Sequence, residues 1–466
     1  MKMRLAEIAQ AVQGELVPAT ATATSLEVTS VAFDSRALTA GALFVPLRGK
    51  RNGHDYVKSA SEHGAVASLW SKDRSTDGVP DDFPLIIVSD PLTALQDLAK
   101  YYLAKINPKV VAVTGSNGKT TTKDLIAAVM QTTFNVTKTQ DNFNNEIGVP
   151  ITILSMSSNT EVLVVEMGMD RPGQLHRLSE LVQPDIAVIT MIGEAHIEFF
   201  GTRAKIAQAK LEITDGLSSD GVFVYDGDEP LLTDQPVRTN PRRFTFGRQG
   251  TNDIYPTKIT ESDQETRFET NRWQDFEFTI PLLGDYNVNN ALAALSVGEL
   301  LEVTPANLRG GLSHPDLTAN RAEWVPGNQG EMILSDVYNS NPTAVRAVLQ
   351  AFADTELDGK RIVVLGDMLE LGDQSEAMHA GLASALNPAT FPMVFLVGSK
   401  MTALFTALMD CYQPETTLFH YTEEQLPKLT TALRSHIAPG DEVLLKASHG
   451  LHLEKVLAAL TKLTKE

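Results

Sequence analysis

The chain has 466 residues, 43% of them hydrophobic, and its 39 basic and 58 acidic side chains give a net charge of −19. It is too long for one hydrophobic core, so two to four domains are expected. A broad anionic field repels nucleic acid and anionic lipid, which argues against partners of either kind. The single cysteine, Cys411, excludes an intrachain disulfide framework and a cysteine-based zinc site, and it is expected to be an inert buried thiol.

The first residues, MKMRLAEIAQAVQGEL, have the pattern of a charged amphipathic helix rather than that of a signal peptide. No apolar run in the sequence approaches the length of a membrane span. These features predict a cytoplasmic, multi-domain α/β protein without membrane insertion.

Residues 1–107 alternate short apolar runs with helical segments, which is typical of a small α/β domain. The expected strands and the helix that follows them cover residues 42–47, 65–70, 85–89 and 92–103. Ser35 and Arg36, together with the basic stretch R-G-K-R further on, suit an anionic ligand such as a diphosphate. A solvated charged loop is the alternative interpretation.

An apolar run over residues 110–113 leads into G-S-N-G-K-T-T-T and then into helical apolar spacing up to residue 130. A strand, a glycine turn and a helix in this order direct unpaired backbone N–H groups at a phosphate. Lys119 supplies a charge, and the Thr120 hydroxyl can reach a Mg²⁺ ion. The usual P-loop spacing requires a glycine where Val113 stands, so this is a shortened form, and an ordinary strand-to-helix turn is the alternative. We predict a nucleoside triphosphate site formed by Gly115, Ser116, Asn117, Gly118, Lys119, Thr120 and Thr121.

Two further strands are expected over residues 162–165 and 186–191, and they lead to Glu166 and His196. Ligands gather at the carboxyl ends of the strands in an open parallel sheet. Both side chains are therefore expected at the same edge as Thr120, where a carboxylate and an imidazole can ligate Mg²⁺. Capping of a helix is the alternative role for His196.

A helix is expected over residues 202–217, with Lys210 beside its apolar face. Its ammonium group either reaches water or points into the site, where a buried lysine loses its proton readily and is open to modification. A second helix, over residues 285–301, begins with three asparagines that can read a base edge or cap the helix. These are Asn287, Asn289 and Asn290.

Residues 317–466 restart the alternation of strands and helices and predict a second doubly wound unit. Its expected strands cover residues 332–334, 362–365, 394–397 and 443–445. In the turn after the first of them, Tyr338 can stack on an adenine and Asp336 can accept a ribose hydroxyl. Arg321 lies just ahead and can supply the charge that a transferring phosphoryl group requires.

Eight segments, spread in order over nearly the whole chain, together resemble the Mur ligases. They are FDSRALTAGALFVPLRG, VTGSNGKTTTKD, NFNNEIGVPITIL, EMGMDRPGQ, GEAHIEFFGTRAKIAQAKLEI, SDVYNSNPTAV, VLGDMLELG and KASHGLHLEKV. The resemblance implies ATP-dependent amide formation in the synthesis of the peptidoglycan peptide. It also implies three domains: a UDP-sugar-binding domain over residues 1–107, a central P-loop ATPase with a parallel sheet over 108–316, and a Rossmann-like domain over 317–466 that binds the amino ligand.

The resemblance further implies roles for single residues. Lys119 and Thr120 would hold the phosphates and a first Mg²⁺, while Glu166 would bridge two Mg²⁺ ions and His196 would bind the second. Lys210 matches the lysine that family members carry as a carbamate, an anionic group that positions metal. Arg321 matches the contact of the γ-phosphate. The implied catalytic set is Lys119, Glu166, His196, Lys210 and Arg321.

Other matches concern the nucleotide and the substrates. Asn290 matches the asparagine that contacts adenine, and Asp336 matches a ribose or phosphate contact. Ser35 and Arg36 fall in the motif that faces the UDP moiety. The remaining residues expected to contact the substrates are Asn144, Asn145, Asn339 and Asn341. The chain departs from the family at Tyr286, where a histidine is usual, and near His449, where an arginine or a similar group is usual.

Members of the family that add lysine or diaminopimelate carry an Asp-Asn-Pro-Arg/Lys signature, which this sequence does not contain. The segment VYNSNP instead favours the branch that adds a dipeptide. The implied substrates are ATP, UDP-N-acetylmuramoyl-tripeptide and D-alanyl-D-alanine, and a monomer is expected. The alternatives are another ligase of the family, folylpolyglutamate synthetase, or a non-catalytic nucleotide-binding protein.

Overall fold

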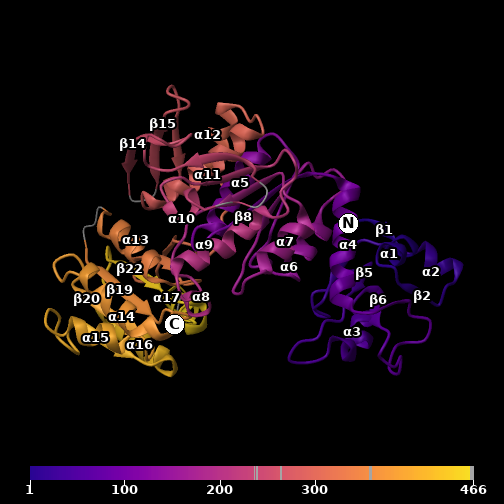
Figure 1. Cartoon of the computed structure of the whole chain (residues 1–466). Helices are drawn as coiled ribbons and strands as arrows, with labels where there is room; N and C mark the ends of the chain where they lie inside the picture. The colour runs from indigo at the N-terminus through magenta and orange to yellow at the C-terminus, as the bar shows by residue number, and fades with distance from the viewer. Residues whose placement is uncertain (236, 238–239, 263–264, 356–358, 462–466) are drawn as a thin grey trace.

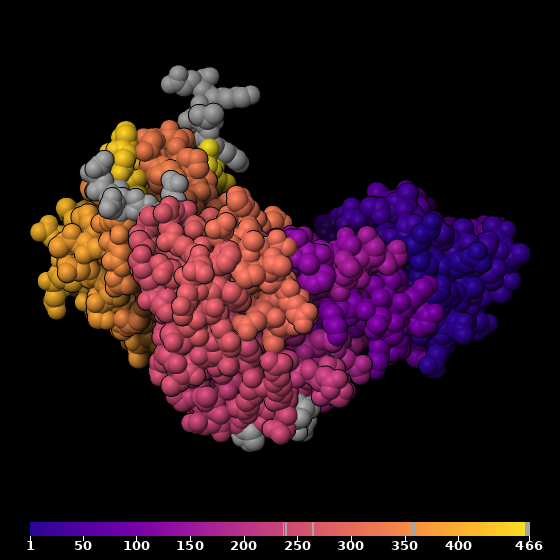
Figure 2. Space-filling view, turned by 90° about the horizontal axis from the view of Figure 1, so that it is seen from above, coloured from indigo at the N-terminus to yellow at the C-terminus, as the bar shows by residue number. Residues whose placement is uncertain are grey.

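A computed structural model describes residues 1–235, 237, 240–262, 265–355 and 359–461. Its strands form three large sheets, one in each third of the chain, with two smaller antiparallel sheets beside them. Figures 1 and 2 show three units in a row, with the N-terminal and C-terminal units on opposite sides of the central one. This is the three-unit α/β architecture that the sequence predicts. The boundaries placed after residues 107 and 316 fall between the large sheets and stay predictions.

The N-terminal unit is built on a five-stranded sheet in the order β2-β7-β6-β5-β4, parallel except for the β2–β7 pair. Its strands are β2 (Glu15–Val17), β4 (Ser30–Ala32), β5 (Ala42–Phe44), β6 (Ala65–Ser71) and β7 (Leu85–Val88), and β1 (Met3–Arg4) pairs separately with β3 (Glu27–Val28). The helices are α1 (Leu5–Ala11), α2 (Ala21–Ser25), α3 (Val57–Glu62) and α4 (Pro91–Ile106). The last helix, α4, packs against helices of the central unit and so joins the two units.

The amphipathic helix predicted at the start of the chain, over residues 1–16, is too long at both ends. The structure has a helix only over α1, flanked by strands β1 and β2. Gln13 has a φ of 51°, and the N–H of Gly14 donates to the carbonyl of Ala9 at 2.8 Å. A left-handed residue with this hydrogen bond ends an α-helix, so the chain can turn into β2.

The central unit contains a fully parallel six-stranded sheet in the order β13-β12-β11-β8-β10-β9. The strands are β8 (Lys109–Thr114), β9 (Val136–Lys138), β10 (Val162–Glu166), β11 (Ile186–Ile189), β12 (Val222–Asp226) and β13 (Arg242–Phe246). Its helices are α5 (Lys119–Gln131), α6 (Gly148–Ser155), α7 (Gln174–Val182), α8 (Ile197–Phe200), α9 (Arg203–Leu211), α10 (Pro230–Thr233), α11 (Tyr286–Leu300) and α12 (Pro305–Ser313). A three-stranded antiparallel sheet follows, with β14 (Pro256–Glu261), β15 (Thr266–Thr270) and β16 (Glu277–Ile280).

Strand β8 lies inside this sheet and is covered on both faces. Val111 and Val113 pack with side chains of α5 and α11, whereas Val110 and Ala112 pack with side chains of α6 and α7. Alternate residues of a strand point to opposite faces, so a strand covered on both sides must be apolar at every position. This explains the unbroken apolar run. Because β8 is packed on both faces, it is a rigid support for the loop that follows it.

The C-terminal unit has a six-stranded sheet in the order β17-β18-β22-β19-β20-β21, in which only the β17–β18 pair is antiparallel. The strands are β17 (Glu323–Pro326), β18 (Met332–Asp336), β19 (Arg361–Gly366), β20 (Met393–Val397), β21 (Leu418–Tyr421) and β22 (Glu442–Lys446). Its helices are α13 (Pro342–Ala353), α14 (Ser375–Ala380), α15 (Thr402–Leu408), α16 (Leu426–His436) and α17 (Glu454–Thr461). Short 3-10 helices elsewhere cover Gly53–Tyr56, Glu212–Thr214, Gly372–Gln374, Gly381–Ala385, Glu423–Gln425 and His449–Leu451.

Cys411 is exposed, so the prediction of a buried thiol is wrong. It lies in the turn after α15, and the neighbouring Tyr412 takes the buried position and donates its hydroxyl to the carbonyl of Phe391. Within the described ranges, no helix has both the length and the apolar content needed to cross a bilayer.

Candidate functional site

A cleft of about 1340 Å³ opens at the carboxyl ends of the central strands. All three units line it: α4 of the N-terminal unit, the loops after β8, β10 and β11 of the central unit, and turns of the C-terminal unit. The lining includes most residues singled out in the sequence: Ser116, Asn117, Gly118, Lys119, Thr120, Thr121, Asn144, Asn145, Glu166, His196, Tyr286, Asn287, Asn289, Asn290, Arg321, Asp336, Tyr338, Asn339 and His449. Gly115, Lys210, Ser35, Arg36 and Asn341 do not line it.

The loop between β8 and α5 depends on two glycines. Gly118 has a φ of 77°, and a side chain there would bring its Cβ within 2.4 Å of the Asn290 Oδ1 atom. A Cβ at Gly115 would lie 1.8 Å from the Thr190 hydroxyl oxygen. The loop is therefore packed tightly against its neighbours, and the first N–H groups of α5 face the cleft, as phosphate binding requires.

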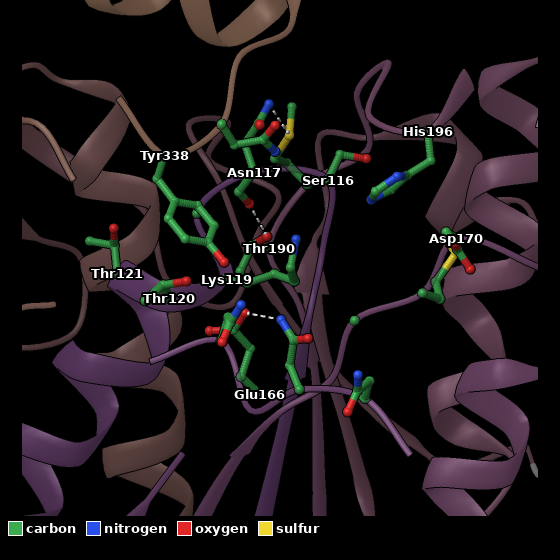
Figure 3. A pocket seen from close by; sticks show the side chains of 18 of the residues that line it. Ser116, Asn117, Lys119, Thr120, Thr121, Glu166, Asp170, Thr190, His196 and Tyr338 are labelled. Atoms are coloured by element: carbon green, nitrogen blue, oxygen red, sulfur yellow. Dashed lines mark hydrogen bonds between the residues drawn. The ribbon is translucent and has the colours of Figure 1, made fainter. Parts of the chain in front are cut away.

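Lys119 begins α5 and bends back over the loop, where its Nζ donates to the Gly115 carbonyl at 2.9 Å. Burial lowers the pKa of Lys119, the nearby Glu166 carboxylate raises it, and the Arg321 charge lowers it. Figure 3 shows Lys119, Thr120 and Glu166 around one part of the cleft, with the ring of His196 pointing toward them. The predicted grouping of Thr120, Glu166 and His196 in one cleft is confirmed.

Glu166 ends β10 and is 2% exposed. Its Oε1 accepts from the Asn144 amide at 2.8 Å, but its Oε2 is buried and has no hydrogen-bond partner. An unpaired buried carboxylate oxygen is costly, and a bound cation would satisfy it. Among the described residues no three His, Cys, Asp or Glu side chains group as a metal site. Mg²⁺ needs only one or two carboxylates when waters and phosphate oxygens complete its shell, so these residues fit that ion.

His196 has a φ of 65° and directly precedes α8. Its Nδ1 lies 2.6 Å from Oε2 of Glu370, which comes from the turn after β19 in the C-terminal unit. The sequence interpretation noted this turn but did not single out Glu370. The hydrogen bond from His196 lowers the pKa of Glu370, against the opposing effect of burial.

Lys210 lies in α9 and is 1% exposed, which makes the water-exposed interpretation wrong. Burial lowers the pKa of Lys210 well below its ordinary value, and the charge of Lys119 adds to this effect. A lysine with a lowered pKa is neutral in a larger share of molecules than an exposed lysine, and the neutral amine is the nucleophilic form. Its side chain does not line the cleft.

The C-terminal unit brings four polar side chains to the opposite wall. The Arg321 guanidinium carbon lies 3.8 Å from the centre of the Tyr338 ring, and its Nε is buried without a partner. Asp336 pairs with the buried Lys446 at 2.7 Å. Figure 3 shows the Tyr338 ring extending into the cleft.

The three asparagines of α11 have different surroundings. The Asn290 oxygen accepts from the Thr122 hydroxyl at 3.1 Å and so ties α11 to α5, and its amide donates to Asn287 within α11 at 2.8 Å. Asn289 lines the cleft with a buried oxygen that has no partner. Burial raises the pKa of Tyr286, which also lines the cleft.

Two of the expected substrate contacts already have structural roles. Asn145 accepts from the backbone N–H of Gly148 at 2.9 Å, at the start of α6. Asn341 caps α13 by accepting from Ala344 at 3.0 Å, and it forms a reciprocal amide pair with Asn117 across the two units, at 2.6 and 3.2 Å.

Ser35 and Arg36 lie in the loop after β4, outside the cleft. Arg36 hydrogen-bonds to Asp34 and holds the pKa of that carboxyl at about 2. The Phe33 ring lies 6.3 Å from that of Phe143, so this loop borders the segment that carries Asn144. Sequence reasoning missed a different set of lining residues, on α4 and α7: Gln96, Lys100, Gln174, His176 and Arg177. Their sequence signal was weak, because polar residues on one face of an amphipathic helix are usual.

Family models cover most of the chain. The model described as the Mur ligase family catalytic domain matches residues 27–103, the Mur ligase middle domain matches 113–298, and the Mur ligase glutamate ligase domain matches 320–449.

Among curated proteins, the chain is similar to a UDP-N-acetylmuramoyl-tripeptide–D-alanyl-D-alanine ligase of Bacillus subtilis, with 41% identity over 99% of this chain and 98% of the relative. The Escherichia coli protein of the same name is 31% identical over 99% and 98%. Among solved structures, MurF from Acinetobacter baumannii superposes with a TM-score of 0.85 at 27% identity, covering 99% of each chain. MurF ligase from Thermotoga maritima in complex with ADP superposes with a TM-score of 0.79 at 29% identity, covering 93% of this chain and 97% of that one.

Proposed function

The chain belongs to the Mur ligase family, and on this premise we propose that it joins D-alanyl-D-alanine to UDP-N-acetylmuramoyl-tripeptide, with ATP converted to ADP and phosphate. The observation that carries the proposal is the single cleft to which three units contribute: a phosphate-binding loop, an unpaired carboxylate oxygen beside it, and a wall from each flanking unit. A reaction of three substrates requires such a meeting point. The product would be the UDP-linked pentapeptide used in peptidoglycan synthesis.

A carboxylate does not accept an amine at neutral pH, because oxide would have to leave. In the proposed reaction, a carboxylate oxygen of the tripeptide attacks the γ-phosphorus of ATP, and the bond from that phosphorus to the ADP oxygen breaks. The dipeptide amine then attacks the acyl carbon, a C–N bond forms, and the C–O bond to phosphate breaks. Inorganic phosphate leaves, and the amine gives up a proton.

The chain's own groups suit the first transfer. The backbone N–H groups after Gly118 and the Lys119 ammonium would bind the phosphates, since both lie at the start of α5. Arg321, with its unpaired Nε, would face the charge that develops on the transferring group from the opposite wall. Asn289 offers a free oxygen to a base edge, and we propose it beside Asn290 as an adenine contact. Asp336 and Tyr338 would contact the nucleoside from the C-terminal unit.

We propose that Thr120, Glu166 and His196 would hold two Mg²⁺ ions, which would neutralise phosphate charge when bound. A carbamate on Lys210 would form when its neutral amine adds to CO₂ and loses a proton, giving an anion that positions metal. The depressed pKa and the burial of Lys210 support this modification.

The three segments 1–107, 108–316 and 317–466 are proposed as domains for the sugar nucleotide, ATP and the dipeptide. Ser35 and Arg36 would face the UDP moiety, while Asn144, Asn145 and residues of α4 and α7 would lie along the peptide. Asn339 lines the C-terminal side of the cleft, where the dipeptide is expected, and Asn341 would reach that side beside Asn117, with which it pairs. Reliance on ATP and a UDP-linked sugar supports a cytoplasmic location.

Mass spectrometry of the product tests the proposal. The protein is incubated with ATP, Mg²⁺, D-alanyl-D-alanine and UDP-N-acetylmuramoyl-tripeptides that carry either lysine or diaminopimelate at the third position. We expect the pentapeptide mass and phosphate release in equal amounts. Phosphate release with pteroylglutamate in place of the sugar nucleotide, or ATP binding without turnover, would contradict the proposal.

A further inference from the structure

The contact between His196 and Glu370 joins two units beside the phosphate loop. The two side chains are 2.6 Å apart, and a second contact supports them, because the Glu198 N–H donates to the Glu370 carbonyl at 3.1 Å. Gly372 packs close to Glu198 as well, so the turn after β19 rests against α8. Glu370 thus reaches His196 only when the C-terminal unit is docked on the central unit.

This hydrogen bond selects one form of the imidazole. An ionised carboxylate only accepts hydrogen bonds, so the proton between the two groups belongs to Nδ1 of His196. When the imidazole is neutral, Nε2 is then unprotonated, and an unprotonated ring nitrogen is the form that ligates a metal. A carboxylate on the other ring nitrogen fixes the ring and makes it a stronger ligand.

We propose that Glu370 is a positioning residue for the metal site: it holds His196 in its metal-binding form and thereby couples binding of a divalent cation to docking of the C-terminal unit. The proposal rests on the proposed role of His196 as a metal ligand. Coupling of this kind is reciprocal, so a cation bound at His196 stabilises the docked arrangement by the same factor by which docking strengthens binding.

The test compares the full-length wild type with Glu370→Gln, His196→Ala and Glu376→Gln. Glu376 is an exposed carboxylate in the same unit that does not line the cleft, so its variant removes the same charge from outside the cleft. Mn²⁺ affinity is measured by electron paramagnetic resonance with saturating ADP. The tautomer of His196 is read in the metal-free protein from the ¹⁵N shifts of its ring nitrogens, with the missing signal of His196→Ala as the assignment. Small-angle X-ray scattering follows docking.

We expect Glu370→Gln to weaken Mn²⁺ binding by about 10-fold and Glu376→Gln to leave it unchanged. The variant should also show a mixture of His196 tautomers, and Mn²⁺ should compact it less than the wild type. If His196→Ala weakens Mn²⁺ binding but Glu370→Gln changes neither the affinity nor the tautomer, the role of Glu370 is wrong and the proposed function stands. If His196→Ala has no effect on Mn²⁺ binding, the metal assignment in the proposed function fails as well.

Discussion

Replacing Glu166 with glutamine should raise stability while it lowers activity. Glutamine keeps an oxygen for the 2.8 Å hydrogen bond from Asn144, so the side chain stays in place. The unpaired Oε2 becomes an uncharged amide, so the cost of an unpaired buried charge is replaced by the smaller cost of an unpaired neutral group, which is about 1–3 kcal/mol. A gain of about 1 kcal/mol in the unfolding free energy corresponds to a rise of about 2–4 °C in Tm for a unit of this size. The loss of the charge that would face Mg²⁺ should reduce turnover about 10²–10³-fold.

Calorimetry in EDTA measures the first effect, and phosphate release with all three substrates measures the second. Asn144→Leu is the matched control, because it removes the donor to Oε1 and leaves both oxygens of Glu166 unpaired. Its Tm should fall, in the opposite direction to that of Glu166→Gln. A Tm of Glu166→Gln several degrees below the wild type, together with retained turnover, would refute the account of Glu166.

Three other changes test separate parts of the site. Lys119→Ala should reduce phosphate release about 10²–10³-fold, since it removes the cation at the phosphate loop, and full turnover would exclude that role. Because burial lowers the pKa of Lys210, a larger share of its amine is neutral near neutral pH than in an exposed lysine, so wild-type activity should fall in CO₂-depleted buffer and return with bicarbonate. Lys210→Ala should be inactive, and short carboxylic acids should restore its activity. A carbamate is contradicted if CO₂ depletion leaves the wild-type activity unchanged and the acids do not restore the activity of Lys210→Ala. Asn341→Ala should destabilise α13 by about 1 kcal/mol in denaturant unfolding whereas Asn341→Asp retains the cap, and equal losses would contradict the capping role.

The sequence predicts the strand–helix alternation well because buried parallel strands must be apolar on both faces. Val110 to Val113 is such a run, and the structure has β8 there, followed by α5 where the helical spacing begins. Prediction fails where a local hydrogen bond overrides periodicity. The left-handed Gln13 and the bond from Gly14 to Ala9 stop the first helix in a segment whose charged and apolar residues otherwise suit a longer one.

The residues of the site also divide into those that the sequence predicts and those that it does not. The phosphate loop, Glu166 and His196 follow from their place at strand ends, since the carboxyl ends of a parallel sheet share one edge. Glu370 does not, because its contact with His196 spans 174 positions and depends on how two units dock. The Asn117–Asn341 pair spans 224 positions and cannot be predicted from the sequence for the same reason. The roles of asparagines are also hard to predict, because the same side chain can cap a helix, join two elements or bind a ligand. Asn145 accepts at the start of α6, Asn290 joins α11 to α5, and the oxygen of Asn289 has no partner.

The arrangement of the cleft also weighs against a protein that only binds nucleotide. Such a protein would need the loop after β8, but it would gain nothing from a lysine buried in α9 or from an unpaired oxygen on Glu166, both of which lower stability. Nor would it need Gln96 and Lys100 of the N-terminal unit in the same cleft as Arg321 of the C-terminal side. A catalyst can keep groups that lower stability when they stabilise a charge that develops only during the reaction. The transfer of a phosphoryl group develops such a charge, and groups from separate units converge on it here.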